Sequence, residues 1–194
     1  MTGRTAPAAV VPAAGRGRRF GGPKLLAPVA GVPLIERTVR SLLEAGVARV
    51  AVVVAPDSAV RAAGDRLPVL ADPRVTIVVN PDPDRGMLSS IQAGLAAVDG
   101  EPVLVLPGDM PFVRPATIVR VLDAARASGV VVSPRCDGRR GHPVALTAKA
   151  AASVLAASAI DLSDALTPFK GDRLELDVDD PGIHRDVDRP ADLG

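Results

Sequence analysis

The chain has 194 residues, of which 23 are Lys or Arg and 22 are Asp or Glu, so its formal net charge is +1 at pH 7. This balance argues against a general nucleic-acid-binding surface, which needs a broad excess of cations. With no Trp or Tyr and three Phe, stacking of bases on aromatic side chains is also disfavoured. The single cysteine, Cys136, excludes an internal disulfide and a multi-thiolate metal site.

The length suits one domain with a sizeable core, and we expect a single domain over residues 1–194 with frayed ends at residues 1–7 and 192–194. No apolar segment near the N-terminus is long enough to span a membrane or direct export. We therefore expect a cytoplasmic protein whose partners include neither a membrane nor a nucleic acid.

Short runs rich in Val and Leu predict strands that are buried on both faces of a parallel sheet. These runs occupy residues 8–11, 47–54, 75–79, 103–106 and 130–132. Helical apolar patterns separate them, at residues 34–43, around residue 60 and at residues 87–98. The alternation predicts an α/β fold, a three-layer Rossmann-like sandwich with a mainly parallel mixed sheet and ligands beyond the carboxyl ends of its strands.

After Pro134 the pattern weakens into a Gly/Arg turn, a short strand around Val144 and an Ala-rich helix over residues 148–157. The segment from there to Gly171 has no clear period. We expect these elements to complete the same domain.

The first apolar run opens into a loop rich in glycine and cations. Residues 11–24 read VPAAGRGRRFGGPK, with glycines at Gly15, Gly17, Gly21 and Gly22 and cations at Arg16, Arg18, Arg19 and Lys24. Glycine amides can line a concave nest and the cations favour a polyanion, which predicts a phosphate cradle. Phe20 breaks the dinucleotide fingerprint, and Pro23 before Lys24 breaks the P-loop. The structural alternative is a flexible basic turn or a nucleic-acid arm.

An acidic turn follows the fourth strand, where residues 104–111 read LVLPGDMP. Asp109 is well placed there to hold Mg²⁺ against phosphates, because Mg²⁺ prefers one or two carboxylates plus phosphate oxygens and water. Its partner is expected in the segment DVDRP at residues 186–190, where Asp186 and Asp188 would point the same way if the segment is extended. The structural alternative for each is a turn or helix-cap aspartate.

Two polar turns supply further candidates. Residues 80–94 read NPDPDRGMLSSIQAG, a turn that leads into a helix start with Ser89 and Ser90, where free amides and hydroxyls can meet a ribose or a pyrimidine. Ordinary N-capping explains one of the serines equally well, and Asn80 is equally ambiguous. Residues 138–143 read GRRGHP, so Arg140 and His142 are candidates for an anionic second substrate, although a lone histidine is more often structural.

The phosphate loop, the GMLSS helix start, the PGDMP turn, the GHP turn and the DVDRP segment occur in one order between Val11 and Leu193. Together they resemble the molybdenum cofactor nucleotidyltransferase family, most closely its cytidylyltransferase branch. The resemblance implies a fold of the nucleotide-diphospho-sugar transferase type and a Mg²⁺-dependent transfer of CMP from CTP to the phosphate of molybdopterin, with release of pyrophosphate.

The resemblance also implies roles for individual residues. Lys24, Arg19 and Asp109 would be catalytic, and Mg²⁺ would be held by Asp109 and Asp188, with Asp186 as a further candidate. Nucleotide binding would involve Ala13, Ala14, Gly15, Gly17, Arg19, Lys24, Asn80, Ser89 and Ser90. A transient contact with a molybdoenzyme or its chaperone would deliver the product.

Ala14 favours CTP, because guanylyl-transferring members carry a second glycine at this place. Three departures from the family pattern are Pro12 for leucine, Phe20 for methionine and Arg189 for threonine. Pro12 is more typical of cytidylyltransferases that act on methylerythritol phosphate, whereas the PGDMP turn argues against them. Open alternatives are therefore GTP as donor, a polyol phosphate as acceptor, or a nucleotide-binding accessory protein without catalysis.

Overall fold

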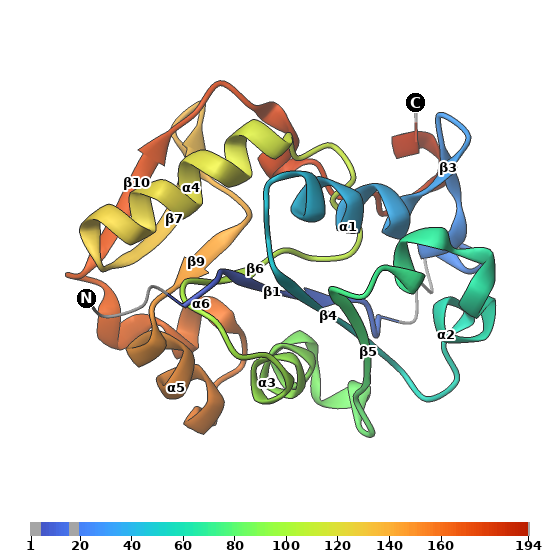
Figure 1. Cartoon of the computed structure of the whole chain (residues 1–194), viewed down its shortest axis with the longest axis horizontal. Helices are drawn as coiled ribbons and strands as arrows, with labels where there is room; N and C mark the ends of the chain where they lie inside the picture. Colours follow the sequence, from blue (N-terminus) through green and yellow to red (C-terminus); the bar gives the residue numbers. More distant parts are fainter. Residues whose placement is uncertain (1–4, 16–19, 194) are drawn as a thin grey trace.

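The computed structural model describes residues 5–15 and 20–193, and it contains a central sheet with helices on both faces (Figure 1). The strands are β1 (Ala8–Pro12), β2 (Pro28–Val29), β3 (Val32–Pro33), β4 (Arg49–Val54), β5 (Val75–Val79), β6 (Val103–Val105), β7 (Val131–Cys136), β8 (Arg139–Arg140), β9 (Val144–Leu146) and β10 (Arg173–Asp177). The helices are α1 (Leu34–Glu44), α2 (Ala59–Ala63), α3 (Met87–Ala97), α4 (Pro115–Ser128), α5 (Ala148–Ala156) and α6 (Leu162–Ala165).

Short 3₁₀ turns connect several of these elements. They are η1 (Lys24–Leu26), η2 (Gly64–Arg66), η3 (Pro68–Ala71), η4 (Pro83–Arg85), η5 (Thr167–Phe169), η6 (Pro181–His184) and η7 (Pro190–Leu193). No helix in the described part of the chain is both long and apolar enough to cross a membrane.

The main sheet runs in the order β10-β7-β9-β6-β1-β4-β5, and β8 pairs with β7 outside this path. Strand β1 is parallel to β4 and β6, β4 is parallel to β5, and β10 is parallel to β7. Strand β9 is antiparallel to both neighbours. The predicted mainly parallel mixed sheet is confirmed, and the carboxyl ends of β1, β4 and β6 meet at one edge, where ligands bind in such folds.

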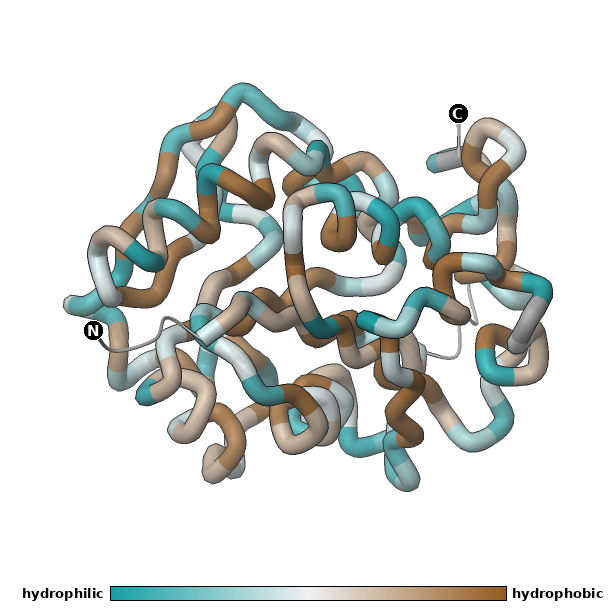
Figure 2. Tube along the Cα trace, in the orientation of Figure 1, coloured by the Kyte–Doolittle hydropathy of each residue, from teal (hydrophilic) through white to brown (hydrophobic). Residues whose placement is uncertain are grey.

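The core has two layers because the sheet is covered on both faces. In β1, Ala8 and Val10 pack into the layer beneath α3 and α5, whereas Ala9 and Val11 pack into the layer beneath α1 and α4. All four side chains are fully buried. This double burial explains why the strand has no polar face, and Figure 2 shows apolar residues concentrated along the central strands.

Helix α3 packs unusually close to the sheet. A Cβ atom added at Gly94 would lie 2.3 Å from Val10 Cγ1 and 2.9 Å from Val53 Cγ2. The glycine therefore permits the approach that brings the start of α3, with Met87 and Ser90, to the edge of the crevice.

The short elements β2, β3 and α6 were not predicted from the sequence, and two longer elements were also missed. Helix α4 has a buried stripe of Ile118, Val121, Leu122 and Ala125, a helical spacing that was available to sequence reasoning. Strand β10 lies at the sheet edge with an exposed or half-exposed surface, so its sequence RLELD lacks the apolar run of a central strand.

The predicted frayed ends lie partly outside the described residues, and their described parts make hydrogen bonds. The carbonyl of Ala6 accepts a hydrogen bond from Glu101 N at 3.2 Å, and that of Pro7 accepts one from Ala48 N at 2.9 Å. At the other end, Asp192 Oδ2 accepts hydrogen bonds from the amides of Asp188 and Arg189 at 2.9 and 2.7 Å.

Candidate active site

A cavity of about 910 Å³ lies beyond the carboxyl ends of β1, β4 and β6, and we call it the loop cavity because the loop after β1 forms one wall. The predicted site residues that line it are Ala13, Ala14, Gly15, Lys24, Ser90, Asp109 and Asp188. Segments far apart in the sequence therefore converge on one crevice. Gly17 and Arg19 of the same loop lie outside the described residues, so their roles stay predictions.

Lys24 is the centre of the charged part of this cavity. Its Nζ donates hydrogen bonds to Asp109 Oδ2 at 2.9 Å and to Asp188 Oδ1 at 2.8 Å. The lysine side chain is only 11% exposed, against 24% for Asp109 and 48% for Asp188. The basic loop and the acidic turn thus meet across a common crevice, as expected.

The protonation of Lys24 follows from these contacts. Burial lowers its pKa, but the hydrogen bonds and charges of Asp188 and Asp109 outweigh that effect and raise the pKa above the usual 10.5. Lys24 is therefore a fixed positive charge near neutral pH, placed where phosphate groups would be attracted.

The two carboxylates are positioned by the backbone. Asp109 follows β6 and Gly108, whose amide donates to the carbonyl of Pro12 at 2.9 Å, so the acidic turn is tied to the end of β1. The amide of Val187 donates to the carbonyl of Asp109 at 3.0 Å, which anchors the C-terminal segment beside the turn. Val187 itself is fully buried.

Asp186 and Asp188 do not point to the same place, contrary to the expectation for an extended segment. The segment is not a strand, and buried Val187 separates the two carboxylates. Asp188 lines the loop cavity with Asp109, whereas Asp186 lines a second cavity. Asp188 is therefore the better candidate partner of Asp109 in a metal site.

Asn80 and Ser89 lie beneath the wall of the loop cavity, and neither side chain lines it. Asn80 Nδ2 donates to Ser89 Oγ at 2.9 Å and to Ser90 Oγ at 3.0 Å, and Asn80 Oδ1 accepts from Asp82 N at 3.0 Å. Their predicted direct contact with a nucleoside is not supported by this geometry. They hold the start of α3, and Ser90 is the residue of this group that reaches the cavity.

A second cavity of about 570 Å³ lies next to the first, and we call it the hairpin cavity because the β7–β8 hairpin forms part of its rim. Arg140 and His142, the predicted second-substrate candidates, both line it. Met87, Pro107 and Asp109 line both cavities. Asp109 therefore stands between two spaces that two different substrates can occupy.

His142 is half-buried and held by a neighbouring strand. Its Nδ1 lies 3.4 Å from the carbonyl oxygen of Val105, which can only accept, so this nitrogen carries the proton in that contact. Burial lowers the pKa of His142, and this effect outweighs the opposing effects of the Val105 carbonyl, Asp109 and Asp186. The imidazole is therefore neutral near pH 7 and keeps Nε2 as an acceptor.

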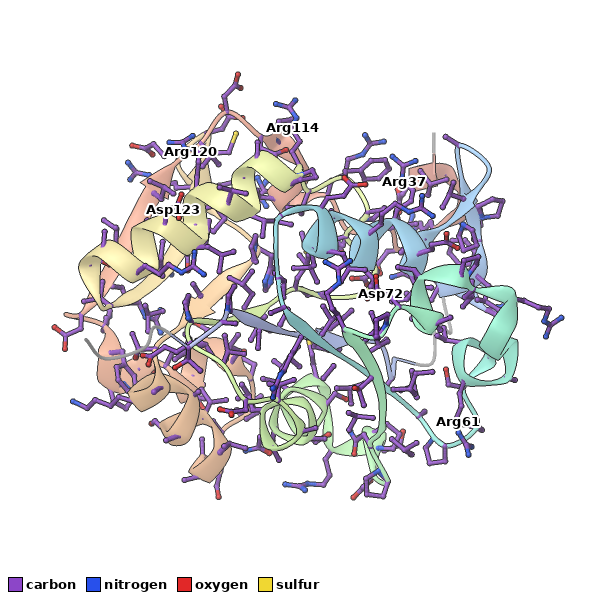
Figure 3. All side chains as sticks on the ribbon, viewed as in Figure 1. Arg37, Arg61, Asp72, Arg114, Arg120 and Asp123 are labelled. Carbon is purple, nitrogen blue, oxygen red and sulfur yellow. The ribbon has the colours of Figure 1, made fainter. Side chains whose placement is uncertain are left out.

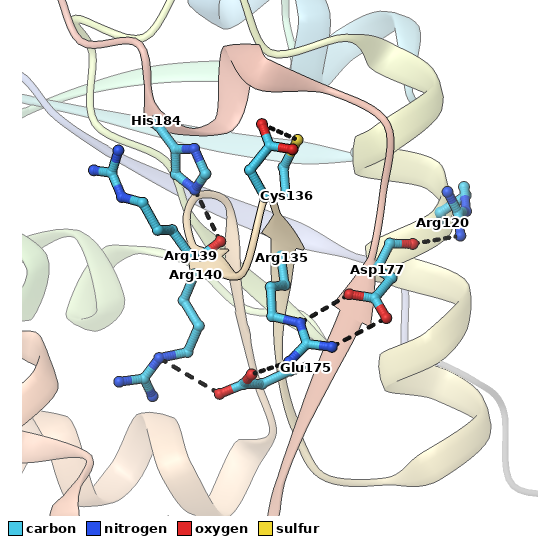
Figure 4. Close-up of polar contacts among 9 residues, drawn as sticks. Arg120, Arg135, Cys136, Arg139, Arg140, Glu175, Asp177 and His184 are labelled. Atoms are coloured by element: carbon cyan, nitrogen blue, oxygen red, sulfur yellow. Dashed lines mark hydrogen bonds and ion pairs between the residues drawn. The ribbon is translucent and has the colours of Figure 1, made fainter.

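Sequence reasoning missed several residues of the two cavities. Asp57 and Ser58 line the loop cavity just after β4, so the rule that ligands bind beyond strand ends could have found them. Arg173 and His184 line the hairpin cavity. His184 Nε2 lies 2.9 Å from the carbonyl oxygen of Arg139 and thereby fixes the hairpin rim, a pairing with no sequence signal (Figure 4).

Two charged side chains of α4 lie outside both cavities. Arg120 and Asp123 project from the exposed face of α4 (Figure 3), and neither lines the loop cavity or the hairpin cavity. They are useful controls for the loss of a charge outside the site.

The strand order and the crevice at the strand ends place the chain among the α/β nucleotide-binding folds. Residues 9–168 match the model of the MobA-like NTP transferase domain, and the chain belongs to this family. The predicted family and fold type are thereby confirmed. Among solved structures, a nucleotidyl transferase from Methanothermobacter thermautotrophicus is 27% identical, with a TM-score of 0.79 over 98% of this chain and 94% of that chain.

Two curated relatives carry more specific names. A 2-C-methyl-D-erythritol 4-phosphate cytidylyltransferase of Cereibacter sphaeroides is 37% identical over 125 residues, which is 62% of this chain and 54% of that protein. The molybdenum cofactor cytidylyltransferase of Escherichia coli K12 is 28% identical over 120 residues, 61% of this chain and 60% of that protein. The chain spans about half the length of the curated relatives it matches.

Proposed function

We propose that the protein is a divalent-metal-dependent nucleotidyltransferase that transfers CMP from CTP to the phosphate group of a small molecule and releases pyrophosphate. Molybdopterin is the acceptor that the residues favour. The observation that carries the proposal is the position of Asp109, which lines both the loop cavity and the hairpin cavity. A shared wall of this kind is what transfer between two bound substrates requires.

In the proposed reaction, an oxygen of the acceptor phosphate attacks the α-phosphorus of CTP in line. A new P–O bond forms while the bond to the leaving pyrophosphate breaks, so no covalent enzyme intermediate is needed. The protein acts by holding two anions that otherwise repel each other and by neutralising the charge that develops. Lys24 supplies such a charge, and Arg19 is predicted to add another.

The residues present fit a divalent cation. Asp109 and Asp188 direct one oxygen each to a single point, which Lys24 Nζ occupies at 2.9 and 2.8 Å. In the described residues no cluster of three or more His, Cys, Asp or Glu side chains is placed to hold a metal, so substrate phosphates and water would complete the shell, as Mg²⁺ prefers. When bound, Mg²⁺ would stabilise negative charge on the phosphate oxygens.

The walls of the hairpin cavity favour a ring-bearing acceptor. Met87, Ile91, Leu162, Leu166 and Ile183 supply apolar surface there. A flat pterin can cover such surface, whereas a polyol phosphate has no ring to place against it. The 37% identity to a methylerythritol-phosphate enzyme nevertheless makes that acceptor the second candidate.

For the donor, CTP is proposed over GTP because Ala14 lines the loop cavity, beside Ala13, where a guanylyl-transferring member carries a second glycine. The methyl group of Ala14 reduces the space available to a purine. Both alanines are at least 94% buried, at 5% and 6% exposure, so they form a fixed wall rather than a mobile rim.

The test is a matrix of pyrophosphate-release assays in Mg²⁺, with CTP or GTP as donor and with molybdopterin, 2-C-methyl-D-erythritol 4-phosphate or no acceptor. Release that requires both CTP and molybdopterin supports the proposal in full. Release that occurs with 2-C-methyl-D-erythritol 4-phosphate but not with molybdopterin would replace molybdopterin as the proposed acceptor. Saturable CTP binding without any release would identify a nucleotide-binding accessory protein and contradict the proposed catalysis.

A further inference from the structure

Arg173, the first residue of β10, lines the hairpin cavity. Its Nε and Nη2 atoms are buried, and in the part of the chain that the structure describes neither has a hydrogen-bond partner. Buried side-chain donors are usually paired, so an unpaired guanidinium edge requires an explanation. Arg37 Nε is the remaining described atom of this kind, and Arg37 lines neither cavity.

The surroundings of Arg173 disfavour the charged form of its side chain. Burial lowers its pKa, and the positive charge of Arg140 lowers it further. Arg139 and Arg140 line the same cavity as Arg173, together with the carboxylates of Asp109, Asp161 and Asp186. The like charge that acts on Arg173 is that of Arg140, and an anion bound between these two arginines would relieve their repulsion.

The two acidic residues of β10, Glu175 and Asp177, contact other arginines. Asp177 accepts hydrogen bonds from Arg135 Nε at 2.8 Å and Nη2 at 3.1 Å on the exposed side of the sheet. Glu175 lies 3.5 Å from Arg135 Nη1 and 3.6 Å from Arg140 Nε. Figure 4 shows that Glu175 bridges Arg135 and Arg140, whereas the Asp177 carboxylate contacts Arg135. Arg140 is thereby held at the rim, while Arg173 keeps its unpaired edge.

We propose that Arg173 and Arg140 bind an oxyanion of the acceptor, a phosphate or a carboxylate, in the hairpin cavity. Nε and one Nη of an arginine form a fork that matches two oxygens of such a group. This inference deepens the proposed function and rests on it for the identity of the acceptor. It defines the acceptor as a molecule with an apolar body, facing Ile91 and Leu166, and an anionic group facing the arginines.

Binding of inorganic phosphate tests the site without any turnover. Calorimetric titrations are made with EDTA and CTP present, on the wild type, Arg173→Gln and Arg120→Gln. Loss of a bidentate, charge-assisted pair predicts that Arg173→Gln binds phosphate at least about tenfold more weakly. Arg120→Gln is the matched control, because it removes an arginine of α4 that lines neither cavity, and it should bind like the wild type.

Acetate titrated in parallel distinguishes a carboxylate site from a phosphate site. The inference would be overturned if the wild type and Arg173→Gln bound phosphate with the same affinity and also bound acetate with the same affinity. Absence of saturable binding of either anion in the millimolar range would overturn it as well. Lys24 is present in every protein compared, so phosphate that binds in the loop cavity contributes equally to each titration. The difference between the wild type and Arg173→Gln therefore stays measurable even if the transferase proposal fails.

Thermal melting separates binding from a purely structural role. Removing an unpaired, desolvated charge should leave the melting temperature of Arg173→Gln equal to or above that of the wild type. With an acceptor that supports turnover, the variant should raise KM for the acceptor and leave KM for CTP unchanged. A lower melting temperature with unchanged phosphate binding would show that Arg173 serves the fold alone.

Discussion

The loop cavity and the hairpin cavity are adjacent, yet their construction differs. The loop cavity gathers segments that each follow a central strand, such as Gly15 after β1, Ser58 after β4 and Asp109 after β6. The hairpin cavity is built from the antiparallel β7–β8 hairpin, edge strand β10 and the segment around Ile183. The first cavity follows the general rule for parallel sheets, whereas the second is built from antiparallel and edge elements that this rule does not cover.

This difference suggests a division of work within the proposed reaction. A nucleotide is common to the whole family, so its site can be carried by the shared framework of strand ends. The acceptor differs between relatives, as the two curated names illustrate. Variable edge elements are a suitable place to recognise it, because they can change without disturbing the core.

The largest expected effect comes from Asp109, the residue that belongs to both cavities. Asp109→Asn removes a charge that meets Lys24 and, in the proposed reaction, the metal, so kcat/KM should fall about a thousandfold while the fold stays intact. Pyrophosphate release and circular dichroism measure the two properties. Asp123→Asn on the outer face of α4 is the charge control. Near-normal turnover of Asp109→Asn would exclude this residue from the mechanism. It would also contradict the proposal that Asp109 connects the two substrate cavities.

Lys24 tests the loop cavity alone. Lys24→Met should lower kcat/KM about a hundredfold, chiefly through weaker CTP binding, because a phosphate contact is lost. It also leaves Asp109 and Asp188 facing each other without their shared ammonium group. Mg²⁺ should therefore raise the melting temperature of Lys24→Met more than that of the wild type. Equal shifts in both proteins would argue against a cation site between these carboxylates.

Much of the fold and of the loop cavity could be predicted from the sequence, because strands buried on both faces have continuous Val and Leu runs. Polar residues that follow those runs must meet at one sheet edge, so the sequence predicts that Lys24 and Asp109 lie in the same crevice. The hairpin cavity could be predicted only through Arg140 and His142. Arg173 belongs to an edge strand without an apolar run, and its role depends on pairing with β7, which the local sequence does not encode.

Gly141 tests the hairpin cavity. A Cβ atom there would lie 2.3 Å from the carbonyl oxygen of Ile183, so Gly141→Ala must shift backbone that positions His142. The expected cost is about 1–3 kcal/mol in the free energy of unfolding, together with a higher KM for the acceptor and an unchanged KM for CTP. Gly171→Ala, where a Cβ meets nothing within 4 Å, is the control. An equal effect on both KM values would break the proposed separation of the cavities.

The smallest effect is the pH dependence that His142 gives to the hairpin cavity. Its pKa in the folded state is below the usual 6.5 because of burial, so the unfolded chain binds more protons as the medium becomes acidic. The stability contribution of the neutral ring is therefore complete above pH 6.5 and decreases as the pH falls toward the folded-state pKa. His142→Asn keeps a donor for Val105 but does not titrate. Urea unfolding between about pH 7.5 and 5 should give a flatter profile for the variant, and parallel profiles would mean that the ring is solvated in the native protein.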